Sequence, residues 1–208
     1  MNSFVKNIKT VIVSQRIDQI PNRNETRDSL DQELLIWLIE AGYLPVQISN
    51  VLMVDDKSLS DSFIQLINPS GIVLSGGNDL GEFPERDKTE LFLINYAVKN
   101  KIPLLGICRG FQMLAKWDGG NLIRIDNHVS EKHSLISEEN DWPDRIKCYH
   151  KWGLVKETSN FTNLAYTEDG SIEAIKHNEL KIEGWMWHPE RNMKYKKIAT
   201  KRIKNLFR

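Results

Sequence analysis

The sequence has no excess of charge of either sign and no long apolar run. Lys and Arg together number 28 and so do Asp and Glu, so no global electrostatic field favours nucleic acid or an anionic membrane as a partner. The first apolar run, residues 10–13, is far too short for a membrane span or a signal-peptide core, and the later runs are short as well. We therefore expect a soluble, cytoplasmic protein that binds neither nucleic acid nor membranes.

Cysteine is also scarce, with only Cys108 and Cys148 in 208 residues. Two cysteines cannot build a disulfide framework or a site with four cysteine ligands, so we expect no metal site. Each thiol needs its own explanation. We expect Cys148 to pack as a small apolar side chain, which is the usual state of a free cysteine.

Hydrophobic residues make up 40% of the chain, enough for one α/β domain spanning residues 1–208. Buried-strand runs alternate with helical periodicity as far as residue 117, which predicts a mostly parallel central sheet flanked by helices. After Gly119 short extended segments predict additional antiparallel strands, and a basic helix is expected from Lys194 to the C-terminus. The expected strands are 9–13, 44–48, 71–74, 102–107, 121–125, 171–177 and 181–187; the expected helices are 29–41, 60–67, 88–99, 109–117 and 194–208.

Cys108 lies where an expected strand turns directly into a helix, with Gly106 and Gly110 two residues away on either side. This G-x-C-x-G pattern is the cysteine version of the nucleophile elbow, in which a strained corner residue lifts its side chain clear of the sheet. The N-terminus of the following helix favours the thiolate. A small buried cysteine is the alternative, which the paired glycines make much less attractive.

Two further segments could complete a catalytic site, although each has an ordinary structural explanation. His188 follows a strand-like run, and Glu190 two residues later could orient its imidazole; a simple turn is the alternative. Gly76 and Gly77 follow the strand at 71–74, where a tight turn would explain them equally well. Without side chains there, the backbone N–H groups of Gly77 and Arg109 could bind an oxyanion.

The sequence resembles class I glutamine amidotransferase domains and their stand-alone γ-glutamyl hydrolase relatives of the C26 peptidase type. The matching motifs occur in family order: SGGND, PLLGICRGFQML, GGNL and HPE. The resemblance implies Cys108 as nucleophile, His188 as general acid/base and Glu190 as its orienting group. It also places Gly76 and Gly77 with Arg109 at the oxyanion site and Gln112 beside the bound γ-glutamyl group. No metal or organic cofactor is implied.

The resemblance implies hydrolysis of a small γ-glutamyl conjugate through a γ-glutamyl thioester. Residues 128–152 depart from the family pattern and carry cations and aromatics, among them His133, His150 and Lys151, that could bind a phosphorylated leaving group. We therefore favour γ-glutamyl-CDP-amidate, an intermediate of capsular polysaccharide synthesis, as substrate; a solvated loop is the alternative reading of this segment.

Other functions stay open at this level. γ-Glutamyl-γ-aminobutyrate and folate polyglutamates are further substrates used in the family. A glutaminase subunit that supplies ammonia to a separate synthetase would show weak activity alone, and a homo-oligomer is not excluded. A non-catalytic binding module, or a related thiol fold of chaperone or deglycase type, fits the complete motif set less well.

Overall fold

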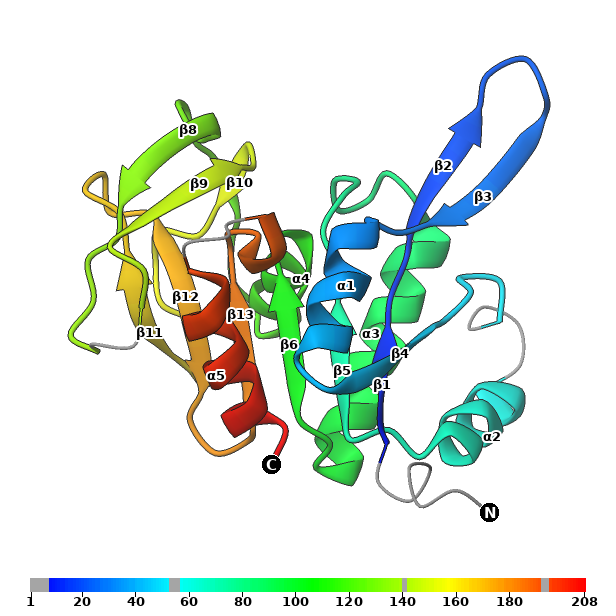
Figure 1. Cartoon of the computed structure of the whole chain (residues 1–208). Helices are drawn as coiled ribbons and strands as arrows, with labels where there is room; N and C mark the ends of the chain where they lie inside the picture. Colours follow the sequence, from blue (N-terminus) through cyan, green and yellow to red (C-terminus); the bar gives the residue numbers. More distant parts are fainter. Residues whose placement is uncertain (1–7, 53–56, 140–141, 192–194) are drawn as a thin grey trace.

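The computed structural model describes residues 8–52, 57–139, 142–191 and 195–208, which build a seven-stranded central sheet (Figure 1). Its strands are β1 (Lys9–Val13), β4 (Tyr43–Gln47), β5 (Gly71–Leu74), β6 (Leu104–Ile107), β11 (Phe161–Tyr166), β12 (Ile172–His177) and β13 (Ile182–Trp185). The order across the sheet is β11-β12-β13-β6-β5-β1-β4. The five strands from β13 to β4 are parallel, whereas β12 is antiparallel to both of its neighbours. The predicted fold class is therefore confirmed.

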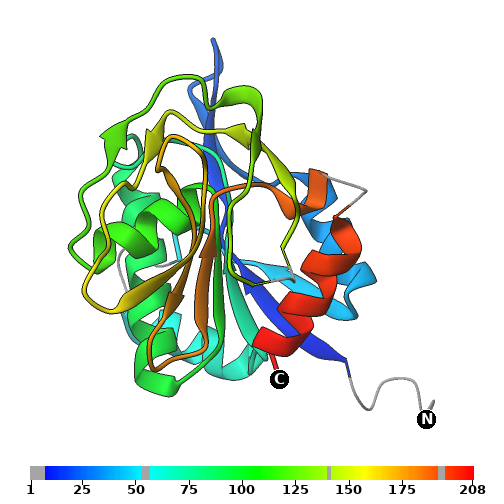
Figure 2. The ribbon, with the colours of Figure 1, turned by 90° about the vertical axis from the view of Figure 1, so that its left-hand side faces the viewer.

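Helices cover both faces of this sheet (Figure 2). The helices α1 (Gln32–Glu40) and α5 (Lys196–Leu206) lie on one face, and α3 (Pro84–Asn100) and α4 (Arg109–Trp117) lie on the other; α2 (Lys57–Ile67) adds Ile64 to the second core. Successive residues of β1 alternate between the two cores, since Val11 and Val13 join the first and Ile12 the second. No helix among the described residues combines the length and apolarity needed to cross a bilayer.

Three two-stranded sheets lie beyond the carboxyl ends of the parallel strands (Figure 1). They are the hairpin of β2 (Arg16–Ile20) and β3 (Glu25–Ser29), the pair β8 (Val129–Ser134) and β9 (Arg145–Tyr149), and the short pair β7 (Ile123–Arg124) and β10 (Trp152–Gly153). Sites in parallel α/β sheets form at this edge. The three small sheets therefore surround the region in which a functional site is expected.

Several predicted boundaries are wrong. The helix expected from residue 29 begins at Gln32, because Asp31 accepts the N–H of Glu33 as its N-cap (3.0 Å) while Ser29 pairs with Arg16 in the β2–β3 hairpin. The helices expected from residues 60 and 88 begin at Lys57 and Pro84, and the strand expected over 102–107 begins at Leu104. The strand expected over 121–125 is only Ile123–Arg124, and Lys194 lies outside the described residues.

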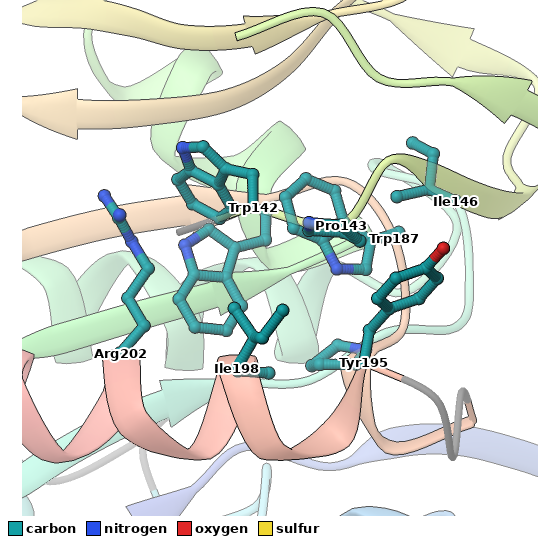
Figure 3. A pocket seen from close by; sticks show the side chains of 10 residues that line it. Trp142, Pro143, Ile146, Trp187, Tyr195, Ile198 and Arg202 are labelled. Carbon is teal, nitrogen blue, oxygen red and sulfur yellow. The ribbon is translucent and has the colours of Figure 1, made fainter. Parts of the chain in front are cut away.

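Tryptophans fix the end of β13 against α5. The rings of Trp185 and Trp187 are stacked with centroids 6.0 Å apart, and Trp142 packs edge-on against both. Ile198 and Arg202 rise from α5 toward this cluster, with the guanidinium of Arg202 3.8 Å from the Trp142 ring centroid (Figure 3). The pocket between these side chains has a volume of about 10 Å³, room for about one water molecule. It is a packing defect too small for a substrate.

Candidate active site

Cys108 lies at the turn from β6 into α4, and its backbone is strained. Its φ of 51° and ψ of −101° place it outside the regions that non-glycine residues favour, and its N–H donates to the carbonyl of Trp185 (2.8 Å). A Cβ at Gly106 would lie 2.5 Å from the backbone of Gly110, and one at Gly110 would lie 2.4 Å from the Leu74 carbonyl oxygen. The two glycines are therefore required for the close approach of α4 to the sheet.

The ring of His188 lies between Glu190 and Cys108. His188 leaves the end of β13 and its Nδ1 lies 2.6 Å from Glu190 Oε1 in the short helix η2 (Pro189–Arg191), while its other side forms a hydrogen bond with the Cys108 side chain. A Cβ at Gly76 would lie 3.1 Å from His188 Nε2 and 3.6 Å from Cys108 Cβ, so Gly76 leaves room for the two groups to meet. Residues from three sheet strands thus converge on one point.

The surroundings of His188 favour its protonated form. Burial is the largest single influence and by itself lowers the pKa of the imidazole. The hydrogen bonds with Cys108 and Glu190, and the negative charges of these two groups, outweigh it and raise the pKa to about 10. At neutral pH the arrangement therefore supports an imidazolium beside the Cys108 sulfur, so a proton donor is in place for a leaving group.

Arg86 determines the orientation of the loop opposite Cys108. Its fully buried guanidinium donates to the carbonyl oxygens of Ser75 (2.9 Å), Gly76 (2.9 Å) and Gly77 (2.6 Å). In a trans peptide the N–H points opposite to the preceding carbonyl, so the bond from Arg86 to the Gly76 oxygen turns the Gly77 N–H away from Arg86. Gly77 lines the same cleft as Cys108. Arg86 therefore fixes the orientation of the Gly77 N–H, the donor that could bind an oxyanion.

Glu90 connects this arginine to the residue after Cys108. Its carboxylate accepts from Arg86 Nε (3.2 Å), from the Ser14 hydroxyl (2.8 Å) and from Arg109, whose guanidinium also pairs with Asp87. The side chains of Arg86 and Glu90 are 0% exposed and that of Arg109 is 2% exposed. Burial lowers the pKa of Arg86 to about 10, which still leaves it charged at neutral pH. Two arginines and two carboxylates thus form a charge-balanced network beneath the site.

A polar cleft of about 380 Å³ opens over the Cys108 turn, a size that suits a small-molecule ligand. Of the residues singled out by sequence, Gly77, Arg109, Gln112, His150, Lys151 and His188 line it together with Cys108. Gly76 and Glu190 line the adjoining pocket, into which His188 also extends. The Gln112 side chain donates to the Trp152 carbonyl (3.1 Å). His133 lines neither pocket, because its ring stacks on His128 and its Nε2 lies 2.8 Å from the Asn127 carbonyl oxygen.

Sequence reasoning gave no site role to six cleft residues: Arg16, Asn78, Asp79, Glu82, Tyr149 and Arg191. Arg191 bonds to Asp31 (2.9 Å) and its guanidinium lies over the Tyr149 ring, whose edge in turn meets His188. Tyr149 and Arg191 directly neighbour predicted site residues in the sequence, His150 and Glu190, so this closeness could have pointed to them. Arg16 lies in the segment SQRID, which reads like the stand-alone hydrolase branch, but the β2–β3 hairpin that carries it was not predicted.

Comparison with known proteins identifies the family of the chain. Residues 27–204 match the family model described as glutamine amidotransferase class-I, and the chain belongs to that family. It is 35% identical over 126 residues to a γ-glutamyl-CDP-amidate hydrolase from Campylobacter jejuni subsp. jejuni, covering 58% of this chain and 62% of that protein. It is also 35% identical over 127 residues to a glutamine-hydrolysing GMP synthase subunit from Methanococcus aeolicus, covering 58% of this chain and 64% of that protein. The matches thus span less than two thirds of either relative.

A solved structure shows the same fold. A protein from Thermoplasma acidophilum, described provisionally as a subunit of GMP synthase, superimposes with a TM-score of 0.71 at 20% identity, covering 97% of this chain and 93% of that one. At this identity the likeness concerns the fold alone. The family of this chain is therefore known, whereas neither relative decides its substrate.

Proposed function

We propose that this chain is a cysteine hydrolase that cleaves a γ-glutamyl amide and releases glutamate, with γ-glutamyl-CDP-amidate as the leading substrate. The observation that carries the proposal is the meeting of Cys108, at its strained turn, with the His188–Glu190 pair. The Campylobacter relative supports the leading substrate by its name.

The chemistry follows from these side chains. The Cys108 sulfur attacks the δ-carbonyl carbon, and the N–H groups of Gly77 and Arg109 stabilise the resulting oxyanion. His188 gives a proton to the departing amine, which leaves a γ-glutamyl thioester on Cys108. His188 then takes a proton from water, the hydroxide attacks the thioester, and glutamate and the free thiolate are released. Glu190 keeps the His188 ring oriented throughout.

The charges around the cleft support a phosphorylated leaving group. Arg16, Lys151 and Arg191 line the cleft and can bind phosphate oxygens, and the aromatic ring of Tyr149 offers a face for a base. Asp79 and Glu82 also line it, so the positive charge is confined to part of the wall. A diphosphate that bridged two of these cations would gain two charge-assisted hydrogen bonds that glutamine cannot form.

A substrate panel tests this proposal. Purified protein is given glutamine, γ-glutamyl-γ-aminobutyrate, a folate polyglutamate and γ-glutamyl-CDP-amidate, and glutamate release is measured. We expect kcat/KM for the CDP-amidate to exceed that for glutamine by about 100-fold, the effect of two such bonds. Lys151→Gln should raise KM for the CDP-amidate and leave glutamine unaffected, and the exposed Lys156→Gln is the matched control. Equal kcat/KM values for all four substrates contradict the assignment.

A glutaminase subunit for a separate synthetase is the second candidate. The relative from Methanococcus aeolicus, which is named as a subunit of GMP synthase, favours this candidate. Its identity to this chain equals that of the Campylobacter relative, over a segment of nearly the same length. In that case glutamine is the best substrate of the panel, and a synthetase partner stimulates its hydrolysis. A γ-glutamyl-γ-aminobutyrate hydrolase is recognised by its preference for that compound in the same measurement.

The pH dependence of kcat/KM should show that activity requires a protonated His188. Because the protonated imidazole supplies the proton to the leaving amine, we expect kcat/KM to fall as pH rises through about 10, the pKa of His188. Glu190→Gln removes a negative charge that raises this pKa, so the alkaline fall should move to lower pH by roughly one unit or more. The exposed Glu179→Gln is the matched control. If the alkaline decrease of kcat/KM occurs at the same pH in Glu190→Gln as in wild type, the role given to His188 and Glu190 is contradicted.

A further inference from the structure

A second cluster of reactive side chains lies outside the catalytic residues. His128, Cys148, His150 and Glu173 are all buried, and one potential ligand atom from each lies within 4.8 Å of the others. Cys148 is on β9, His128 and His150 flank the β8–β9 pair, and Glu173 is on β12 of the central sheet. The cluster therefore joins a small peripheral sheet to the main one.

Three of its atoms lack a hydrogen-bond partner among the described residues: His128 Nδ1, His150 Nε2 and Glu173 Oε1. The two nitrogens each lie 3.5 Å from Glu173 Oε1, and Cys148 Sγ lies 4.0 Å from Glu173 Oε2. The side chains of His128 and Glu173 are 0% exposed and that of His150 is 1% exposed. Buried polar atoms are nearly always satisfied, and at 3.5 Å these contacts lie at the long limit for a hydrogen bond. A cation between the two nitrogens and the carboxylate would satisfy all three atoms.

The remaining nitrogen of each histidine is already engaged. His128 Nε2 lies 2.8 Å from Asp169 Oδ2, and His150 Nδ1 lies 3.1 Å from the Trp152 carbonyl oxygen. Asp169 is itself held by the hydroxyl of Thr167 (2.7 Å). Metal-ligating histidines are oriented in this way, with one nitrogen bonded to a carboxylate or a carbonyl and the other turned to the ion.

We propose that these four side chains bind one zinc ion, with His128 Nδ1, Cys148 Sγ, His150 Nε2 and Glu173 as a tetrahedral ligand set. Zn²⁺ at about 2.0–2.3 Å from its ligands separates neighbouring ligand atoms by about 3.3–3.6 Å. The two distances of 3.5 Å already match this range, whereas the wider spacings, which reach up to 4.8 Å, must contract when the ion binds. A thiolate and two imidazoles favour zinc over magnesium or calcium. Cys148 loses its thiol proton to solvent on binding, and the two anions then neutralise the cation inside the protein.

The ion is structural in this proposal and takes no part in cleavage. It fixes the segment from Cys148 to His150 onto Glu173 of β12, and Tyr149, His150 and Lys151 of the same segment line the catalytic cleft. Metal binding would thereby set the position of the wall that faces the leaving group. The expectation of no metal, which rested on the cysteine count, is replaced here because a single cysteine suffices when histidines and a carboxylate complete the set.

Metal content tests the proposal directly. Protein from zinc-supplemented cells, dialysed free of loosely bound ions, should contain about one zinc per chain by mass spectrometry. Cys148→Ser should lose most of this zinc, whereas Cys108→Ser, the matched thiol control, should keep it. Reconstitution of metal-depleted protein with Co²⁺ should give the intense visible absorption of a tetrahedral site and the charge-transfer band of a thiolate ligand, both absent in Cys148→Ser.

Thermal unfolding keeps the test decisive if Cys148→Ser does not fold. Wild-type Tm should decrease by several degrees with a strong chelator and recover with added zinc. Wild type that binds neither Zn²⁺ nor Co²⁺ and keeps its Tm in the chelator overturns the proposal, and the cluster is then held by shared protons. Loss of the metal from Cys108→Ser, with retention in Cys148→Ser, also overturns it by placing the ion at the catalytic thiol.

Discussion

Cys108→Ala should reduce glutamate release by about 10⁴-fold or more from whichever γ-glutamyl substrate is best, since removing the nucleophile from a triad leaves only binding and the oxyanion donors. No neighbouring group can replace the sulfur. The only other thiol in the sequence, Cys148, is 0% exposed and is part of a different cluster. Steady-state turnover of the variant against wild type, with free glutamate as the readout, measures the loss.

Two controls separate chemistry from folding in this experiment. Cys108 is a small side chain with 7% exposure, so the alanine variant should keep the wild-type Tm to within a few degrees. An electrophilic glutamine analogue should add one mass equivalent to wild type, at Cys108, and none to the variant. Persistent turnover in the alanine variant, or labelling that remains after the substitution, removes Cys108 as the nucleophile.

The Cys108 turn could be predicted because its sequence signals are local. A buried strand, two glycines at fixed offsets and an amphipathic helix follow one another within residues 102–117, and each glycine is required by a backbone approach that the structure shows. The alternation of apolar runs with helical periodicity likewise predicted the parallel sheet. Where short-range chemistry decides the conformation, the sequence alone was sufficient.

The beginning of α3 could not be predicted for the opposite reason. The helix was expected from residue 88, and residues 84–87 in front of it were not assigned to any element. Residues 84–90 are mostly charged, yet Arg86 and Glu90 are fully buried. Their burial depends on partners far along the chain, among them Ser14, Ser75 and Arg109. Only the assembled fold reveals that the charges face inward and support the Ser75–Gly77 loop.

The histidine-rich segment shows the same limit in another form. Residues 128–152 were read as a possible binding wall, and His150 and Lys151 do line the cleft. The inward atoms of His128, Cys148 and His150 instead meet Glu173, which lies on a strand of the central sheet. No spacing in the sequence predicts a ligand set that is assembled from two different sheets, so the cluster could be recognised only in the folded structure.

Glu90→Gln should be the most destabilising conservative change in the network beneath the site. The carboxylate balances the buried guanidinium groups of Arg86 and Arg109, and its loss leaves net positive charge in a region where these side chains are at most 2% exposed. Removing one partner from a buried ion pair costs about 3–5 kcal/mol in the free energy of unfolding. For a chain of this length that corresponds to a Tm decrease of about 10 °C or more.

The same substitution should also impair catalysis at temperatures where the variant is still folded. Glutamine at position 90 keeps one acceptor oxygen, but its NH₂ group cannot accept from an arginine and its charge no longer balances Arg86 and Arg109. Arg86 is then less firmly held under the Gly76–Gly77 peptide, so kcat should decrease more than KM changes. Glu85→Gln, one turn earlier on α3 and exposed, is the matched control and should leave both Tm and kcat near wild type. Calorimetry and steady-state kinetics on both variants measure the two effects, and a wild-type Tm for Glu90→Gln contradicts the structural role given to the network.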